Sequence, residues 1–141
     1  MKKIFVLHTE KALLKAYEDF LSAMKYEVFA TSNHYKFLLY AGEIHSDFLI
    51  FDTGENLNSD FIKVLKNQEK TKNVPLLLIT TESNRSKLPS EAEYILFKPF
   101  DITDFIKILP LSEKNQQITN TNNIFYVENK QKQQDLTDIL G

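Results

Sequence analysis

The chain has 141 residues, which is enough for one domain with a modest tail and too short for two full domains. Apolar residues make up 43% of it, and the net charge of −2 gives no basic excess for binding nucleic acid. The lack of cysteine excludes disulfides, thiolate metal ligands and a cysteine nucleophile. No apolar run could span a bilayer or serve as a signal peptide, so we expect a cytoplasmic protein with no membrane association.

The first half of the chain alternates short apolar runs with segments of helical period. The apolar runs predict strands and the periodic segments predict amphipathic helices. The predicted strands cover residues 4–7, 26–31 and 48–51, and the predicted helices cover residues 11–25 and 35–44. The third strand ends directly before Asp52.

The second half continues this alternation. Its predicted strands cover residues 75–80 and 94–97, and its predicted helices cover residues 60–67 and 101–109. We expect Phe61, Val64 and Leu65 to face inward from the first of these helices, and Asp101 to cap the second. Residues 83–91 are short and polar, which predicts a fourth helix shortened by about one turn of 3.6 residues.

Five buried strands that alternate with helices predict an α/β fold, with a doubly wound parallel sheet covered on both faces. In such folds the functional site lies at the carboxyl ends of the strands. The residues just after the predicted strands, which we expect to meet there, are His8, Thr9, Glu10, Asp52, Thr80, Thr81 and Lys98.

Three of these residues form a set with a chemical meaning. A carboxylate such as Asp52 can attack phosphorus and form an acyl phosphate. An ammonium and a hydroxyl, here Lys98 and Thr80, can bind the phosphoryl oxygens as charge develops. Pro99 follows the lysine, and a cis Lys98–Pro99 bond would aim the lysine inward. Without a phosphoryl group, Lys98 would form a salt bridge with Asp52.

Four stretches of the chain resemble the receiver domain of two-component response regulators, over residues 1–110. They are Lys2-Lys3-Ile4-Phe5-Val6-Leu7, Ser46-Asp47-Phe48-Leu49-Ile50-Phe51-Asp52, Val74-Pro75-Leu76-Leu77-Leu78-Ile79-Thr80-Thr81 and Phe97-Lys98-Pro99-Phe100-Asp101. The resemblance implies a flavodoxin-like five-stranded fold and a role in signal transduction. It makes Asp52 the candidate phosphoacceptor, and Thr80 and Lys98 the phosphoryl-binding and switch residues, supported by Thr81 and Pro99.

The sequence departs from the receiver pattern where the metal would bind. Receivers have two acidic residues after the first strand, and this chain has His8 and Thr9 there. In the family these acids hold Mg²⁺ together with the phosphoacceptor and a backbone carbonyl, which matches that of Gly54. An imidazole and a hydroxyl are poor replacements for carboxylates around Mg²⁺. Glu10 and Glu55 are the only substitutes nearby in sequence, so we expect no metal or cofactor, or Mg²⁺ if phosphorylation is retained.

Two functions follow from this pattern. One is a receiver-like module that acts through protein–protein contacts, with weak or no Mg²⁺-dependent phosphorylation. Such a module is not an enzyme, apart from self-phosphorylation and dephosphorylation of the receiver type. The other is a phosphorelay receiver phosphorylated on Asp52. The partner in either case would be a histidine kinase or a downstream protein, and a homodimer is left open. A flavodoxin-like ligand binder and a His8–Glu10–Asp52 metal site are further alternatives.

Composition changes after Pro110. Residues 111–141 are expected to form a polar linker and tail rather than a second domain, because about 30 residues cannot build a core of their own. Within this tail, residues 124–127 predict a short strand and residues 130–140 a weak helix.

Overall fold

A computed structural model describes residues 1–110 of the chain, and the predicted linker, strand and helix of the tail lie outside the described residues. The strands are β1 (Lys3–His8), β2 (Glu27–Thr31), β3 (Phe48–Gly54), β4 (Leu76–Thr81) and β5 (Tyr94–Lys98). The helices are α1 (Lys11–Ala23), α2 (His34–Glu43), α3 (Ser59–Lys66) and α4 (Ile102–Ile108), with a 3-10 helix η1 (Glu82–Lys87) before β5.

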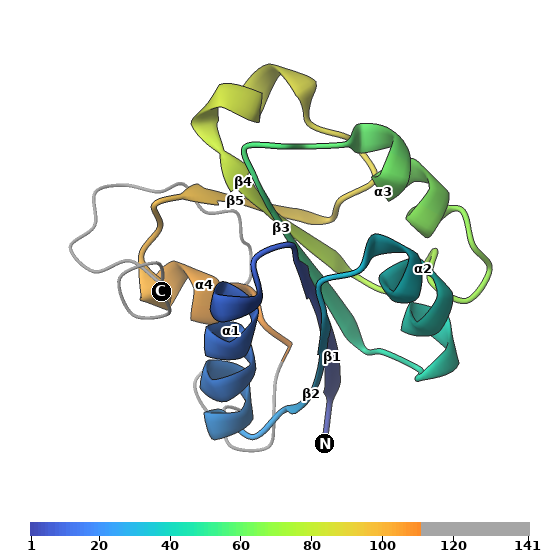
Figure 1. Ribbon diagram of the computed structural model, residues 1–141, viewed down its shortest axis with the longest axis vertical. Coiled ribbons are helices and arrows are strands. Elements are labelled where there is room, and N and C mark those ends of the chain that lie inside the picture. The colour runs from blue at the N-terminus through green and yellow to red at the C-terminus, as the bar shows by residue number, and fades with distance from the viewer. Residues whose placement is uncertain (111–141) are drawn as a thin grey trace.

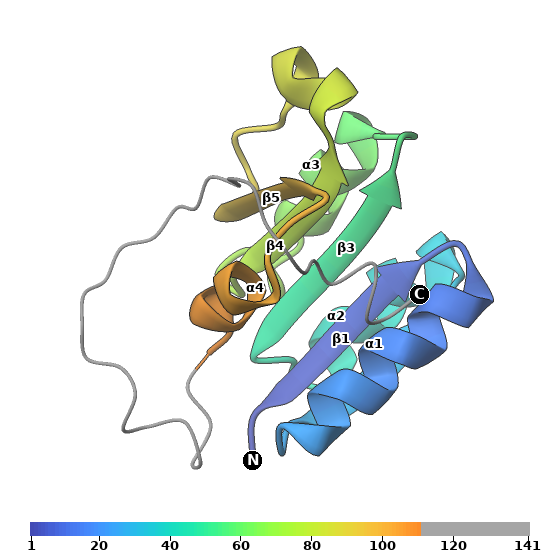
Figure 2. The ribbon, with the colours of Figure 1, turned by 90° about the vertical axis from the view of Figure 1, so that its left-hand side faces the viewer.

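The strands form one parallel sheet in the order β2-β1-β3-β4-β5, which confirms the predicted doubly wound fold. Helices α1 and α4 cover one face, and α2 and α3 cover the other (Figures 1 and 2). Successive side chains of a strand point to opposite faces, so Ile4 and Val6 of β1 join one core while Phe5 and Leu7 join the other. The continuous apolar runs of the sequence therefore reflect burial on both faces.

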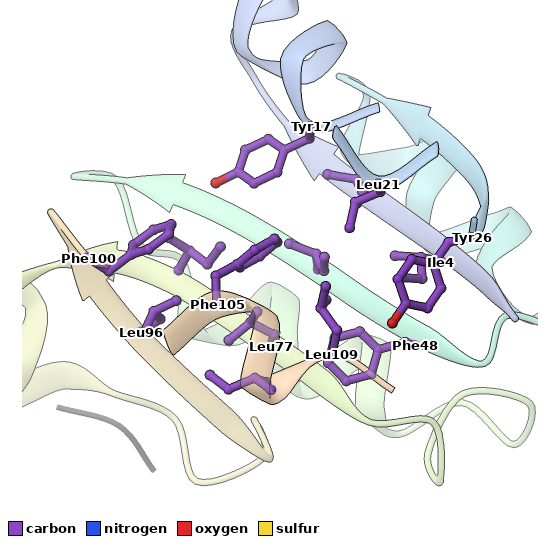
Figure 3. Packing of buried hydrophobic residues seen from close by; sticks show 14 of the residues in the cluster. Ile4, Tyr17, Leu21, Tyr26, Phe48, Leu77, Leu96, Phe100, Phe105 and Leu109 are labelled. Carbon is purple, nitrogen blue, oxygen red and sulfur yellow. The ribbon is translucent and has the colours of Figure 1, made fainter. Parts of the chain in front are cut away.

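The core under α1 and α4 reaches from one end of the sheet to the other (Figure 3). Two buried tyrosines, Tyr17 and Tyr26, lie well apart in it. The hydroxyl of Tyr26 donates a hydrogen bond to the carbonyl of Pro110. This bond secures the end of the domain, where Leu109 is also buried.

Two local predictions were wrong, both at helices. In α3 the buried apolar residues are Ile62 and Leu65, whereas the side chain of Val64 is half exposed. The helix is too short for its periodicity alone to define which side faces the core. Asp101 stands at the N-cap position of α4, but its side chain makes no capping hydrogen bond.

The fourth helix of the expected fold is replaced by η1, six residues of 3-10 helix, in agreement with the predicted shortening. Such tight helices are uncommon beyond a few residues, and Pro89 follows closely after this one. Within residues 1–110, no helix combines the length and the apolar character that crossing a membrane requires.

Candidate functional site

Strands β1, β3, β4 and β5 end at the same edge of the sheet and bring the predicted residues together. The register places His8 of β1 beside Asp52 of β3. An irregularity in β3 between Asp52 and Gly54 then puts Gly54 level with Thr80 of β4. Lys98 ends β5, and its peptide bond to the following proline is cis. The topology thus gathers residues that are far apart in the sequence.

Asp52 is fully buried, and groups from three elements hold its carboxylate. Lys98 Nζ lies 2.8 Å from Oδ2. The hydroxyl of Tyr17, from α1, donates to the same oxygen over 2.6 Å. The backbone N–H of Gly54 donates to Oδ1 over 3.1 Å. Both carboxylate oxygens therefore have partners within the protein, as a charged group in such a position requires.

His8 is buried beside this carboxylate, in electrostatic contact with it but without a well-formed hydrogen bond. Its Nδ1 accepts a hydrogen bond from the backbone N–H of Glu10 over 3.0 Å. In a neutral imidazole the proton therefore resides on Nε2. That nitrogen lies 3.4 Å from Asp52 Oδ2 and makes no hydrogen bond. His8 thus presents an N–H group to Asp52, where a carboxylate would present an oxygen.

Thr80 is buried in a second network, centred on the backbone carbonyl of Gly54. The hydroxyl of Thr80 donates to this carbonyl over 2.9 Å. Asn84 of η1 donates through Nδ2 to Thr80 Oγ1 over 2.9 Å, and to the carbonyl of Glu55 over 3.3 Å. Gly54 has a φ of +60°, a left-handed conformation that glycine adopts without strain. Asn84 therefore links the end of β4 to η1 and to the loop after β3.

Burial and charge act against each other on Asp52. Burial alone would raise the pKa of its carboxyl, but His8 and the Lys98 ammonium more than offset this and hold that pKa below its ordinary value. The pKa of the Tyr17 hydroxyl is raised well above its ordinary value by burial and by the negative charge of Asp52. Tyr17 is therefore a neutral donor to a charged acceptor at ordinary pH.

Because His8 and Lys98 lower the pKa of Asp52 in the folded protein, we expect the free energy of unfolding to depend on pH. The folded-state pKa of Asp52 lies below its unfolded value of about 4, so its contribution is complete above that pH. The contribution is lost as the pH falls through the folded pKa. Urea unfolding between pH 6 and pH 3 should show a steeper loss of stability for the natural chain than for Asp52→Asn. Equal slopes for the two proteins would contradict the prediction.

Other predicted residues lie at the edge of the site or outside it. Thr9, Glu10, Glu55 and Pro99 are exposed, and Thr81 is half-buried with its hydroxyl 2.8 Å from that of Ser83. No three His, Asp or Glu side chains within residues 1–110 are grouped so that they could hold a metal ion. The alternative His8–Glu10–Asp52 metal site therefore does not assemble in the described structure.

Sequence reasoning missed the site roles of Tyr17 and Asn84. The helical period of residues 11–25 places the Tyr17 ring on the apolar face of α1, where it does lie, but it carries no information about the partner of the hydroxyl. Asn84 belongs to a segment that the sequence marked only as short and polar. A tyrosine on a buried helix face needs a partner for its hydroxyl, and this requirement was the available signal for Tyr17.

Solved structures with a similar fold include receiver domains and a protein that contains one. A response regulator receiver modulated diguanylate cyclase from Pelobacter carbinolicus is 27% identical, with a TM-score of 0.65 over 76% of this chain and 87% of that chain. The chemotaxis response regulator CheY4 of Vibrio cholerae is 24% identical, with a TM-score of 0.64 over 77% and 99%. This chain has the receiver-domain fold. No protein-family model and no curated protein matches its sequence.

A third structure with the receiver fold contains a bound metal ion. The receiver domain of a sensor histidine kinase from Pseudomonas aeruginosa contains a magnesium ion in its active-site cleft. It is 17% identical, with a TM-score of 0.66 over 76% of this chain and 93% of that chain, so the likeness concerns the fold alone.

The residues of the present site do not fit a magnesium ion. Magnesium needs several hard oxygen ligands in nearly octahedral geometry. Here Asp52 Oδ2 already contacts Lys98 and Tyr17. The carbonyl of Gly54 accepts threonine hydroxyl groups. His8 directs an N–H group rather than a lone pair toward the carboxylate. The cation beside Asp52 is the lysine side chain.

Proposed function

We propose that this chain is a receiver-type signal-transduction module that acts through protein–protein contacts, with weak or no Mg²⁺-dependent phosphorylation of Asp52. The observation that carries the proposal is the buried Lys98–Asp52 ion pair. It is supported by His8 and Thr9, which stand where the receiver resemblance implies an acidic pair. A metal would offset charge in the transition state of phosphoryl transfer, and its loss slows that transfer. Lys98 already neutralises the carboxylate in the resting protein.

The contact surface that we propose includes η1 and β5. Asn84 connects this side of the molecule to Thr80, so a change at the site alters the support of η1. Next to it, the guanidinium of Arg85 lies over the ring of Phe97 at 4.3 Å from the centroid. Arg85 is also paired with Glu82 at 2.7 Å. This surface is charged, and it contains η1 in place of the fourth helix of the expected fold. Such a surface suits a protein partner, either a histidine kinase or a downstream protein of the cytoplasm.

The second candidate is a working phosphorelay receiver, phosphorylated on Asp52. The presence of the set Asp52, Thr80 and Lys98 at one edge favours it. This function requires Glu10 or Glu55 to supply the missing metal ligand. Both side chains are exposed, so the loops that carry them would have to move toward Asp52.

Incubation with phosphoramidate, with and without Mg²⁺, distinguishes the two candidates. We expect intact-mass spectrometry to detect little or no phosphoryl adduct under either condition, because the carboxylate is buried and no metal assists the transfer. An ordinary receiver labelled in the same buffer is the positive control. A Mg²⁺-dependent adduct that disappears in Asp52→Asn would establish the phosphorelay function instead.

A further inference from the structure

Tyr17 occupies an unusual position for a core residue of a helix. It lies in the middle of α1, its side chain is almost fully buried, and its ring packs near that of Phe105 with centroids 6.1 Å apart. Figure 3 shows the ring extending from α1 over the sheet, with the hydroxyl at the end away from the helix. That hydroxyl is the one that reaches Asp52. The first helix therefore contributes directly to the closure of the site.

Both carboxylate oxygens of Asp52 are occupied by protein partners as well as buried. Oδ2 is in contact with the Lys98 ammonium and the Tyr17 hydroxyl, and Oδ1 accepts the N–H of Gly54. An open hollow at this edge is lined by Thr9, Thr53 and Glu55, among others, but not by Asp52. A phosphodonor needs an unobstructed oxygen with its phosphorus in line. Neither oxygen offers this in the described structure.

The Lys98 ammonium and the Tyr17 hydroxyl are the two groups within hydrogen-bond distance of Oδ2, with His8 Nε2 farther away at 3.4 Å, and they differ in their freedom to leave it. The side chain of Lys98 is 19% exposed and flexible, so its ammonium can follow a phosphoryl group or turn to solvent. The rigid ring of Tyr17 is packed in the core, and its hydroxyl cannot leave Oδ2 unless the ring or α1 moves. Buried polar groups also keep their partners, because an unsatisfied hydroxyl is unfavourable. Tyr17 is therefore the persistent obstacle.

We propose that Tyr17 is a positioning residue whose hydroxyl blocks the Asp52 carboxylate from a phosphodonor. The position of α1 then controls access to this carboxylate. This inference rests on the proposed function, in which Asp52 is phosphorylated weakly or not at all. It names Tyr17 as a second cause of that low reactivity, besides the altered acidic pair. It assigns to α1 a role in the site that the receiver resemblance did not imply. Removal of the hydroxyl should free a lone pair of Oδ2 while the ring continues to fill the core.

The reaction that reports access is phosphoryl transfer from phosphoramidate. A carboxylate oxygen of Asp52 forms a bond to phosphorus, and the P–N bond breaks. The electron pair of that bond stays on nitrogen, which leaves as ammonia after taking up a proton from solvent. The product is an acyl phosphate on Asp52.

The main test uses a background in which both acids are restored, His8→Asp/Thr9→Asp, so that a missing metal does not hide the effect. Adding Tyr17→Phe to this background should raise the rate of Mg²⁺-dependent labelling about tenfold, equivalent to about 1.4 kcal/mol of barrier. Asp52→Asn in the same protein should abolish the adduct. Equal labelling rates with tyrosine and phenylalanine would overturn the proposal, whether both rates are high or both are undetectable.

Tyr26→Phe is the matched control. It removes the hydroxyl of a buried tyrosine, together with its hydrogen bond, at the other end of the same core from Tyr17 (Figure 3). A general loosening of the domain would raise labelling in both variants. The proposal requires the increase in Tyr17→Phe alone, and an equal increase in Tyr26→Phe contradicts it.

A second readout does not depend on metal or on the restored acids. A water-soluble carbodiimide takes up a proton from solvent and bonds to a carboxylate oxygen of Asp52, and methylamine then displaces the urea, loses a proton to solvent and leaves an amide. Peptide mass spectrometry should find Asp52 modified about tenfold faster in Tyr17→Phe than in the natural chain. An unchanged rate would overturn the inference while leaving the proposed function intact. By contrast, ready phosphorylation of the natural chain would overturn the proposed function itself.

Discussion

Lys98→Met should lower the free energy of unfolding by about 3–5 kcal/mol, the usual range when one member of a buried ion pair is removed. The large effect follows from Asp52, which has no exposed surface and would lose the cation that neutralises it. The Tyr17 hydroxyl, the Gly54 N–H and the more distant N–H of His8 would remain, and these donors only partly compensate a buried carboxylate. Urea unfolding at neutral pH measures the difference.

Two further variants show whether this loss comes from the pair itself. Lys70→Met removes a lysine whose salt bridge with Glu43 is well exposed, and should change stability by less than about 1 kcal/mol. The double variant Asp52→Asn/Lys98→Met removes both charges and should be more stable than Lys98→Met alone. If Lys98→Met is as mild as Lys70→Met, the pair does not stabilise the site as described.

His8→Asp/Thr9→Asp should make the stability of the domain depend on Mg²⁺, whereas the natural chain should unfold at the same temperature with Mg²⁺ or with chelator. Without metal, the new carboxylates add negative charge beside buried Asp52 and lower stability. Bound Mg²⁺ then stabilises the variant by mass action, by about 2.7 kcal/mol at a hundredfold excess over Kd. Thermal unfolding in Mg²⁺ and in chelator measures both effects.

The uncharged variant His8→Asn/Thr9→Asn is the matched control for this experiment. It has nearly the same shape as the aspartate variant and should show no response to Mg²⁺. Stabilisation of the natural chain by Mg²⁺ would contradict the proposal that this site works without the metal. A lack of response in the aspartate variant would show that the acidic pair is not what separates this site from a metal site.

The strand pattern of the sequence was sufficient to place Asp52, Thr80 and Lys98 at one edge. Each follows a buried apolar run, and parallel strands end on the same side of a sheet. The helical details were harder. In α3, with eight residues, several faces are compatible with the spacing of apolar residues, and packing on the sheet selected Ile62 over Val64. At Asp101 the residue type favoured a cap that the described side-chain geometry does not form.

The sequence by itself determined the order of strands and helices, the two-faced burial of the sheet and the positions of His8, Thr9, Asp52 and Lys98 along the chain. These features depend on local periodicity and on which residue follows each strand. Only the tertiary structure decided how the Asp52 carboxylate is satisfied. The contact from Tyr17 joins residues 35 apart in sequence, and the link from Asn84 depends on the path of η1. The periodicity of the sequence predicts neither contact, because each depends on how α1 and η1 pack against the ends of β3 and β4.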